Sequence, residues 1–101
     1  MGSSTSPDFD PVTFEVLNHR LLTISEEMGI NYMRCSGSNV LITGNDAASA
    51  IMDKEGALVS VGPYIVTQGN VLPLIVRSTL SSPQCEEIKD GDIFICNDPY
   101  M

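Results

Sequence analysis

A long amphipathic helix near the start of the chain limits the possible folds more than any other feature of the sequence. Asp10 is a favourable N-cap, and Pro11 suits the first helical position, where its missing N–H has no helical partner. We expect a helix from Pro11 to about Met28, with Gly29 able to end it and the apolar rhythm able to extend it by a turn. The apolar residues that recur at steps of three and four along it are Phe14, Leu17, Leu21, Ile24 and Met28.

A β-hairpin is expected after this helix. Residues 50–52 and 57–61 are rich in apolar and β-branched side chains, and the turn residues 53–56 separate them. Small residues precede the first strand at 47–50, so another element or a ligand could approach the backbone closely. Asp46 begins this run. From the residues alone, a turn-capping role for Asp46 is favoured over a catalytic one.

Three further segments complete the predicted fold. Residues 40–42 predict a short buried strand, and a second helix carrying residues 71–80 is expected after a cap at Thr67 or Asn70. Residues 93–96 predict a final buried strand with Cys96 buried and unreactive, because the run is short and apolar and lies between a glycine turn and Pro99. The order helix, strand, hairpin, helix, strand indicates an α+β fold, a mixed sheet with packed helices that is part of a larger domain.

Composition excludes several classes of function. The 101 residues carry 5 basic and 13 acidic side chains, a net charge of -8, which repels nucleic acid and anionic membranes. No apolar run is long enough to span a bilayer. Three cysteines without paired spacing argue against a disulfide framework and a zinc ribbon, and favour reduced thiols in the cytoplasm. The Ser-rich residues 1–9 are expected to be a disordered arm.

The chemistry-bearing motifs with well-defined spacing are missing. The sequence contains no GxGxxG, GxxxxGK[ST], HExxH or GxSxG pattern, and His19 is its only histidine. Asp98, which precedes Pro99 at the end of the last predicted strand, is a carboxylate held in a defined direction. The residues by themselves therefore describe an acidic α+β segment with two suggestive aspartates, Asp46 and Asp98.

Three segments taken together resemble the start of the hydantoinase B/oxoprolinase family. They are residues 10–16 with the helix that follows, the hairpin region 46–56, and the ending at residues 91–100. The similarity implies that residues 10–101 are the N-terminal portion of such a domain, truncated before its metal-binding motif. Related subunits of acetone and acetophenone carboxylases share the same resemblance.

The resemblance implies a place in an ATP-dependent complex. The chain would be the N-terminal part of the metal-bearing B-type subunit of a cyclic-amide hydrolase acting on a hydantoin, lactam or oxoproline-like substrate. A hydantoinase A-type partner would bind ATP-Mg, and the full-length B-type subunit would hold a divalent metal, zinc or manganese. The isolated 101-residue chain is expected to be inactive.

The resemblance also assigns roles to individual residues. Asp46 is the expected catalytic carboxylate and a metal ligand, and Asp98 is a second metal ligand. Glu15 is a further catalytic candidate on the first helix. The main metal ligands are expected beyond Met101.

One departure from the family pattern bears on the substrate. Many hydantoin- and oxoproline-type members carry an Arg-rich segment where this chain has residues 33–38, with Arg34 as the one cationic side chain. A less cationic segment favours a neutral lactam, hydantoin or ketone. Two alternatives stay open: a subunit of an ATP-dependent ketone carboxylase, and a non-catalytic assembly module.

Overall fold

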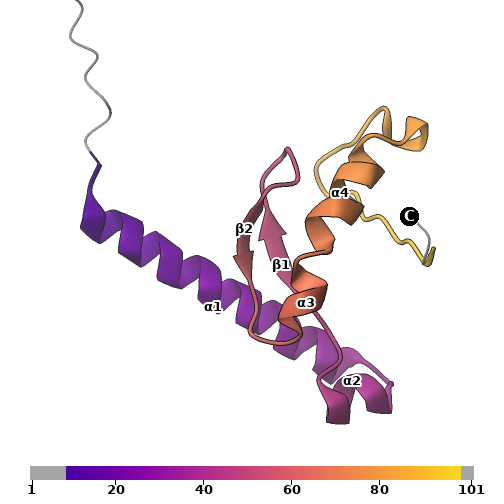
Figure 1. The fold of residues 1–101 in the computed structure, drawn as a ribbon, viewed down its shortest axis with the longest axis horizontal. Coiled ribbons are helices and arrows are strands. Elements are labelled where there is room, and N and C mark those ends of the chain that lie inside the picture. The colour runs from indigo at the N-terminus through magenta and orange to yellow at the C-terminus, as the bar shows by residue number, and fades with distance from the viewer. Residues whose placement is uncertain (1–8, 99–101) are drawn as a thin grey trace, which may run out of the picture.

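The computed structural model describes residues 9–98, which form an α+β arrangement built on one long helix (Figure 1). The predicted α+β class is confirmed. A two-stranded antiparallel hairpin lies across the C-terminal half of that helix, and shorter helices follow it. The elements in order are α1 (Pro11–Cys35), α2 (Asn39–Gly44), β1 (Ala50–Met52), β2 (Leu58–Val61), α3 (Val66–Gly69), α4 (Leu72–Leu80) and the 3-10 turn η1 (Pro83–Cys85).

The start of α1 is fixed by its cap. The carboxylate of Asp10 accepts a hydrogen bond from the Val12 amide at 3.1 Å and another from the Thr13 hydroxyl at 2.5 Å, so amides and hydroxyls of the first turn have a partner. The predicted N-terminus is confirmed. The helix continues to Cys35, well beyond Met28, because Gly29 serves as a packing position inside the helix instead of ending it.

The hairpin is confirmed. Its strands pair Ala50 with Val61 and Ile51 with Ser60, with one irregularity between Ile51 and Met52. The connecting turn is closed by Asp53, whose Oδ1 accepts hydrogen bonds from the amides of Glu55 and Ala57 at 2.9 and 2.8 Å. These two bonds hold the pKa of Asp53 below its usual range, the Ala57 amide contributing most.

The hairpin packs on a small-residue face of α1. Ser25 is fully buried and its hydroxyl donates to Ser60 Oγ at 2.9 Å, while Ser49 Oγ donates to the Ser25 carbonyl at 2.7 Å. One turn further, a side chain at Gly29 would lie 2.2 Å from the Tyr64 ring. Small side chains on both surfaces allow this close contact between helix and hairpin.

The apolar stripe predicted for this helix lies beside that contact and is not covered by it. Leu21 is half-buried, while the other four residues are 42–57% exposed. Among the side chains that the structure describes, Ala47 is the apolar residue that is buried, at 5% exposed. The stripe is therefore a surface of this molecule. Its members are Phe14, Leu17, Leu21, Ile24 and Met28.

Two predicted strands are wrong. Residues 40–42 lie inside α2, where the Ile42 amide donates to the Ser38 carbonyl at 3.0 Å, so the backbone is satisfied locally. Residues 93–96 are extended but pair with no strand in the described part of the chain, and Cys96 is exposed, not buried. A strand requires a partner backbone. The sheet is consequently an antiparallel pair and not a mixed sheet.

The second predicted helix is confirmed as α4, which is preceded by the single turn α3 and carries Pro73 in its first turn, where proline is tolerated. The predicted cap at Thr67 or Asn70 is wrong, because Val71 precedes the helix and no side chain caps it. The expected disordered arm at residues 1–9 lies outside the described residues except for Phe9. The Phe9 ring lies 5.5 Å from the ring of Phe14, centroid to centroid. Over residues 9–98, no helix has the length and apolar character needed to cross a bilayer.

Candidate functional site

The clearest candidate site is the carboxylate of Asp46 at the entrance to the hairpin. α2 ends at Gly44 and is capped by Asn45, which adopts a left-handed conformation with φ of 49° and turns the chain toward β1. Asp46 Oδ1 then accepts a hydrogen bond from the Gln68 side-chain amide at 2.9 Å. The next residue, Ala47, is buried, and its carbonyl accepts from the Ile65 amide at 3.2 Å. Backbone and side-chain contacts with the α3 region therefore fix the position of an exposed carboxylate.

A small hollow adjoins this turn. Its volume is about 190 Å³, and it lies between the end of α1 and α2. The hollow combines one guanidinium and one side-chain amide with apolar walls, a combination that can bind a carbonyl oxygen or an anion. The residues that line it are Ile30, Met33, Arg34, Ile42 and Asn45.

Glu15 lies elsewhere on the molecule. It is exposed on the first half of α1, ten residues before Ser25, where the hairpin meets the helix; this is about 15 Å along the axis at 1.5 Å per residue. Its neighbours in a shallow depression on the helix surface are Val12, Val16 and His19. The described chain does not bring Glu15 to the Asp46 turn.

Asp98 is exposed at the end of the extended segment that follows the turn at 89–92. Its amide donates to Cys96 Sγ at 3.4 Å, a local contact within that segment. Nothing in the described contacts joins Asp98 to Asp46.

The described residues do not by themselves supply a full ligand set for the expected metal, whose main ligands are expected outside them. Among residues 9–98, no three His, Cys, Asp or Glu side chains gather closely enough to hold an ion. A catalytic divalent ion needs about three protein ligands. Asp46 and Asp98 therefore stay predicted ligands of a site that residues outside 9–98 would complete.

Sequence reasoning missed the partners of two important residues. Gln68 was not expected to contact Asp46, because the two are 22 positions apart and no pattern links them. The Ser25, Ser49 and Ser60 contact was missed as well. The signal that could have found it is the small-residue pair Ser25 and Gly29, which lie one helical turn apart and so share a face.

The chain belongs to the hydantoinase B/oxoprolinase family, whose model matches residues 10–101. The predicted resemblance is therefore confirmed. The chain is also similar to individual named proteins. It is 29% identical over 90 residues to 5-oxoprolinase 1 of Arabidopsis thaliana, covering 89% of this chain and 7% of the relative.

Two further relatives carry the same activity in their names. The chain is 27% identical over 95 residues to the 5-oxoprolinase PfmaA of Pestalotiopsis fici, covering 94% of the chain and 7% of the relative. It is 27% identical over 101 residues to the 5-oxoprolinase of Dictyostelium discoideum, covering 97% and 8%. The chain thus spans less than a tenth of the length of these relatives. No solved structure matches it.

Proposed function

We propose that residues 10–101 act as the N-terminal part of the B-type subunit of an ATP-dependent cyclic-amide hydrolase. The observation that carries this proposal is the family match across residues 10–101, together with relatives named as 5-oxoprolinases that align with nearly the whole chain. The proposal includes an A-type partner that binds ATP-Mg and a divalent metal, zinc or manganese, whose ligands come chiefly from outside these residues.

The proposed reaction opens a ring amide at the expense of ATP. The γ-phosphoryl group of ATP is transferred to the amide oxygen, which makes the ring carbon more electrophilic. Water then adds to that carbon and the ring C–N bond breaks with the nitrogen taking a proton, which leaves an acyl phosphate. A second water hydrolyses the acyl phosphate to the acid and inorganic phosphate. The products are a ring-opened acid, ADP and inorganic phosphate. A group that accepts a proton from the attacking water is required.

Asp46 is the residue of this chain best suited to that role. The Gln68 amide binds Oδ1, which orients the carboxylate, and the side chain is exposed so that water can reach it. Glu15 lies too far along α1 to share the step within one copy.

The C-terminal segment offers a surface for the rest of such a domain. Ile93 and Ile95 are 86% and 93% exposed, whereas Phe94 and Cys96 line a hollow over α4. Alternate side chains of this segment therefore point to α4 and to solvent, as in a strand with one covered face. Asp98 follows directly, so the surface that joins the remainder also positions the proposed second ligand.

The proposed substrate class is based on the hollow that adjoins the turn before Asp46. Arg34 is its one cationic side chain, in the segment where many family members are richer in arginine. A neutral hydantoin or lactam needs only carbonyl recognition, whereas the carboxylate of 5-oxoproline benefits from additional positive charge. We therefore place a neutral cyclic amide ahead of 5-oxoproline.

The test is ATP turnover by the full-length B-type subunit that carries these residues, assembled with its A-type partner. The expected result is ADP formation dependent on a hydantoin or lactam, coupled to ring-opened product in bicarbonate-free buffer. ATP turnover that requires both bicarbonate and a ketone would contradict the hydrolase and support the carboxylase alternative. If the subunits assemble but turn over none of these substrates, the non-catalytic assembly module would be the remaining interpretation.

A further inference from the structure

The exposed apolar stripe of α1, here called the α1 seam, is an interaction surface without a partner in the described structure. Its first half projects beyond the hairpin, as Figure 1 shows for the indigo end of α1. Four of its five members are 42–57% exposed in one copy. The seam consists of Phe14, Leu17, Leu21, Ile24 and Met28, and extends about 21 Å at 1.5 Å per residue.

The spacing of the α1 seam is that of a two-stranded coiled coil. Steps of three, four, three and four place Phe14, Leu21 and Met28 at heptad position a and Leu17 and Ile24 at position d. Such a seam packs against a second helix with the same repeat. The chain itself offers no other helix of this length in residues 9–98, since α4 has 9 residues and α2 has 6.

An apolar groove lies at the C-terminal end of the seam. It has a volume of about 700 Å³ and lies between α1, β1 and α4. Met28 belongs to both the seam and the groove, so the two surfaces are continuous. The groove is lined by Met28, Asn31, Tyr32, Ala48, Ser49, Ala50, Met52, Leu72 and Val76.

The charged residues beside the seam select one arrangement of two copies. Arg20 and Glu27 occupy heptad position g, and neither takes part in an ion pair within residues 9–98. In an antiparallel pair of helices, position g of one helix lies beside position g of the other. The register that opposes Leu17 with Met28, and Leu21 with Ile24, therefore sets Arg20 beside Glu27 of the second copy. Because a twofold axis relates the two copies, this contact occurs twice in the dimer.

Shifting the helices by one heptad loses the contact between opposite charges. A shift in one direction sets Arg20 against Arg20 of the second copy, and a shift in the other sets Glu27 against Glu27. The first shift keeps four apolar layers, so the charges decide against it, whereas the second leaves two layers in which Ile24 opposes Met28. A parallel pair would bring Arg20 beside Ser25, which is buried under the hairpin and is uncharged.

We propose that two copies of this chain associate through antiparallel α1 seams, each inserting the projecting half of its helix into the groove of the other. In the favoured register Phe14 of one copy lies beside Asn31 and Tyr32 of the second, at the mouth of the groove. The alanines of β1 and the segment before it give the incoming helix room. Reciprocal insertion covers the seam and both grooves together.

The proposal rests on this chain's own residues and not on the proposed reaction. Its first test is sedimentation of the 101-residue chain over a concentration series. The expected species has twice the 10.9 kDa mass of one chain. A monomer throughout the series would overturn the proposal, as would open-ended aggregation without a discrete dimer.

Substitution of one seam residue gives the second test. Leu17→Glu places a charge in two layers of the dimer and should weaken association by roughly a hundredfold or more. Leu17 is 57% exposed, so a single copy should keep its circular dichroism spectrum. The matched control is Val12→Glu, which alters a 71% exposed residue about 140° away round the helix and should leave the dimer intact. An equal loss of dimer affinity in both variants would show that the α1 seam is not the interface.

A charge exchange tests orientation and register. Arg20→Glu and Glu27→Arg should each weaken the homodimer by roughly tenfold, because each sets like charges together twice. The double variant should recover the original affinity, and an equimolar mixture of the two single variants should form a heterodimer. Indifference of the dimer to these exchanges would exclude the antiparallel register, since only that register brings the two positions together.

Discussion

At the scale of single residues, the contact between α1 and the hairpin depends on side chains that are absent or small. An added Cβ at Gly62 would lie 2.5 Å from Ser49 Oγ and 3.1 Å from the Ser25 carbonyl oxygen. Ser49 in turn donates to that carbonyl. A methyl group at this position must therefore displace either a hydrogen-bonded hydroxyl or the backbone of α1.

We expect Gly62→Ala to destabilise the chain by about 1–3 kcal/mol, the usual cost of overpacking a tight contact. The matched control is Gly37→Ala, because no atom lies within 4 Å of a Cβ at Gly37. Urea unfolding followed by circular dichroism measures both. Equal midpoints for the two variants would show that the hairpin can move away from α1 at little cost.

The catalytic role proposed for Asp46 gives a second prediction at this scale. Asp46→Asn keeps the shape of a turn residue but removes the charge, so a turn-only role predicts normal activity. A role in proton transfer predicts a loss of product formation of about a hundredfold in the full-length complex. The measurement is product and ADP release by the same sample, with ADP release expected to persist if ATP binds the proposed A-type partner.

Asp90→Asn serves as the control, since Asp90 is an exposed turn carboxylate remote from the hairpin entrance in sequence. An Asp46→Asn complex that forms product at the wild-type rate would reduce Asp46 to a turn residue.

The thiols give a third prediction. Cys35 and Cys96 are exposed, and Cys85 is partly buried. Within the 101-residue chain, a thiol reagent should therefore label Cys35 and Cys96 faster than Cys85 under native conditions. Peptide mass spectrometry after a short exposure identifies the labelled sites. Protection of Cys96 from labelling would mean that its segment is buried against other protein surface in solution.

At the scale of elements, α1 and the hairpin are each closed by a capping aspartate. The hydroxyl of Thr13 and the amide of Val12 hold the pKa of Asp10 below its usual range. Hydrogen bonds from the Ala57 and Glu55 amides do the same for Asp53. Both side chains are fully exposed, so the caps act through hydrogen bonding to the ionised carboxylate and not through burial.

The lowered pKa values fix the direction of the pH dependence. A carboxyl group with a folded pKa below its unfolded value, about 3.9 for aspartate, contributes stability that is present above the unfolded pKa and is lost as pH falls through the folded pKa. Thermal unfolding of the wild-type chain should therefore shift to lower temperature below about pH 4. The Asp10→Asn, Asp53→Asn double variant should show a smaller shift over the same range.

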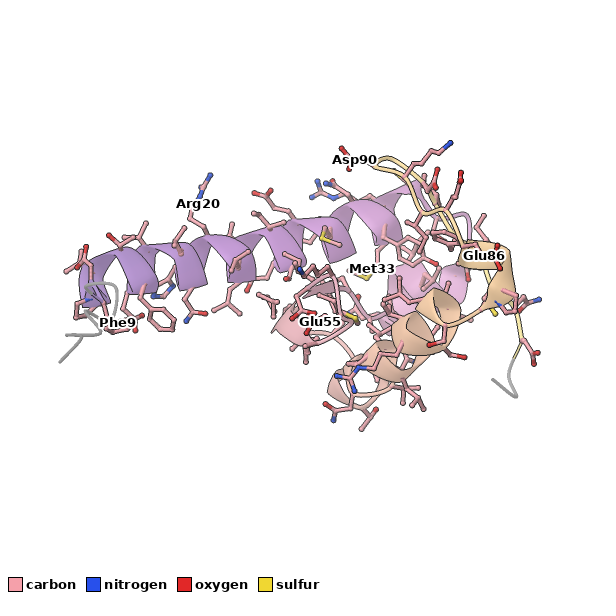
Figure 2. All side chains as sticks on the ribbon, turned by 90° about the horizontal axis from the view of Figure 1, so that it is seen from above. Phe9, Arg20, Met33, Glu55, Glu86 and Asp90 are labelled. Atoms are coloured by element: carbon pink, nitrogen blue, oxygen red, sulfur yellow. The ribbon has the colours of Figure 1, made fainter. Side chains whose placement is uncertain are left out.

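Figure 2 shows the whole molecule from above, with α1 extending far from the cluster of hairpin and short helices, and with Arg20 on its projecting part. Among the described residues, burial is concentrated where α1 meets the hairpin, at Ser25, Gly29, Ser60 and Gly62. Large apolar side chains remain exposed on α1, on α4 and in the C-terminal segment. The molecule therefore presents three apolar surfaces for association with a second copy or with further protein.

The expected absence of a tightly bound catalytic metal is a prediction for the isolated chain as a whole. A structural or catalytic divalent ion requires about three ligands in one place. Elemental analysis of the 101-residue chain after gel filtration should find zinc and manganese well below one equivalent. Stoichiometric metal that survives the column would mean that these residues form a site alone.

The sequence by itself determined the elements that are stabilised locally. The Asp10 cap, the helix from Pro11, the hairpin turn closed by Asp53 and the proline-initiated α4 all follow from contacts within a few residues. The family resemblance was also carried by local segments. Spacing and turn chemistry suffice for such features because both partners of each interaction lie in the same short stretch.

Only the tertiary structure decided which surfaces meet. The apolar spacing of α1 predicted a buried stripe, but the hairpin packs on Ser25 and Gly29 instead. At these small residues the two backbones can approach closely, which the large side chains of the stripe do not allow. Residues 93–96 have the composition of a strand yet remain unpaired in the described chain, because a strand forms only when a second backbone is supplied. The Gln68 contact of Asp46 likewise depends on a turn more than twenty residues away.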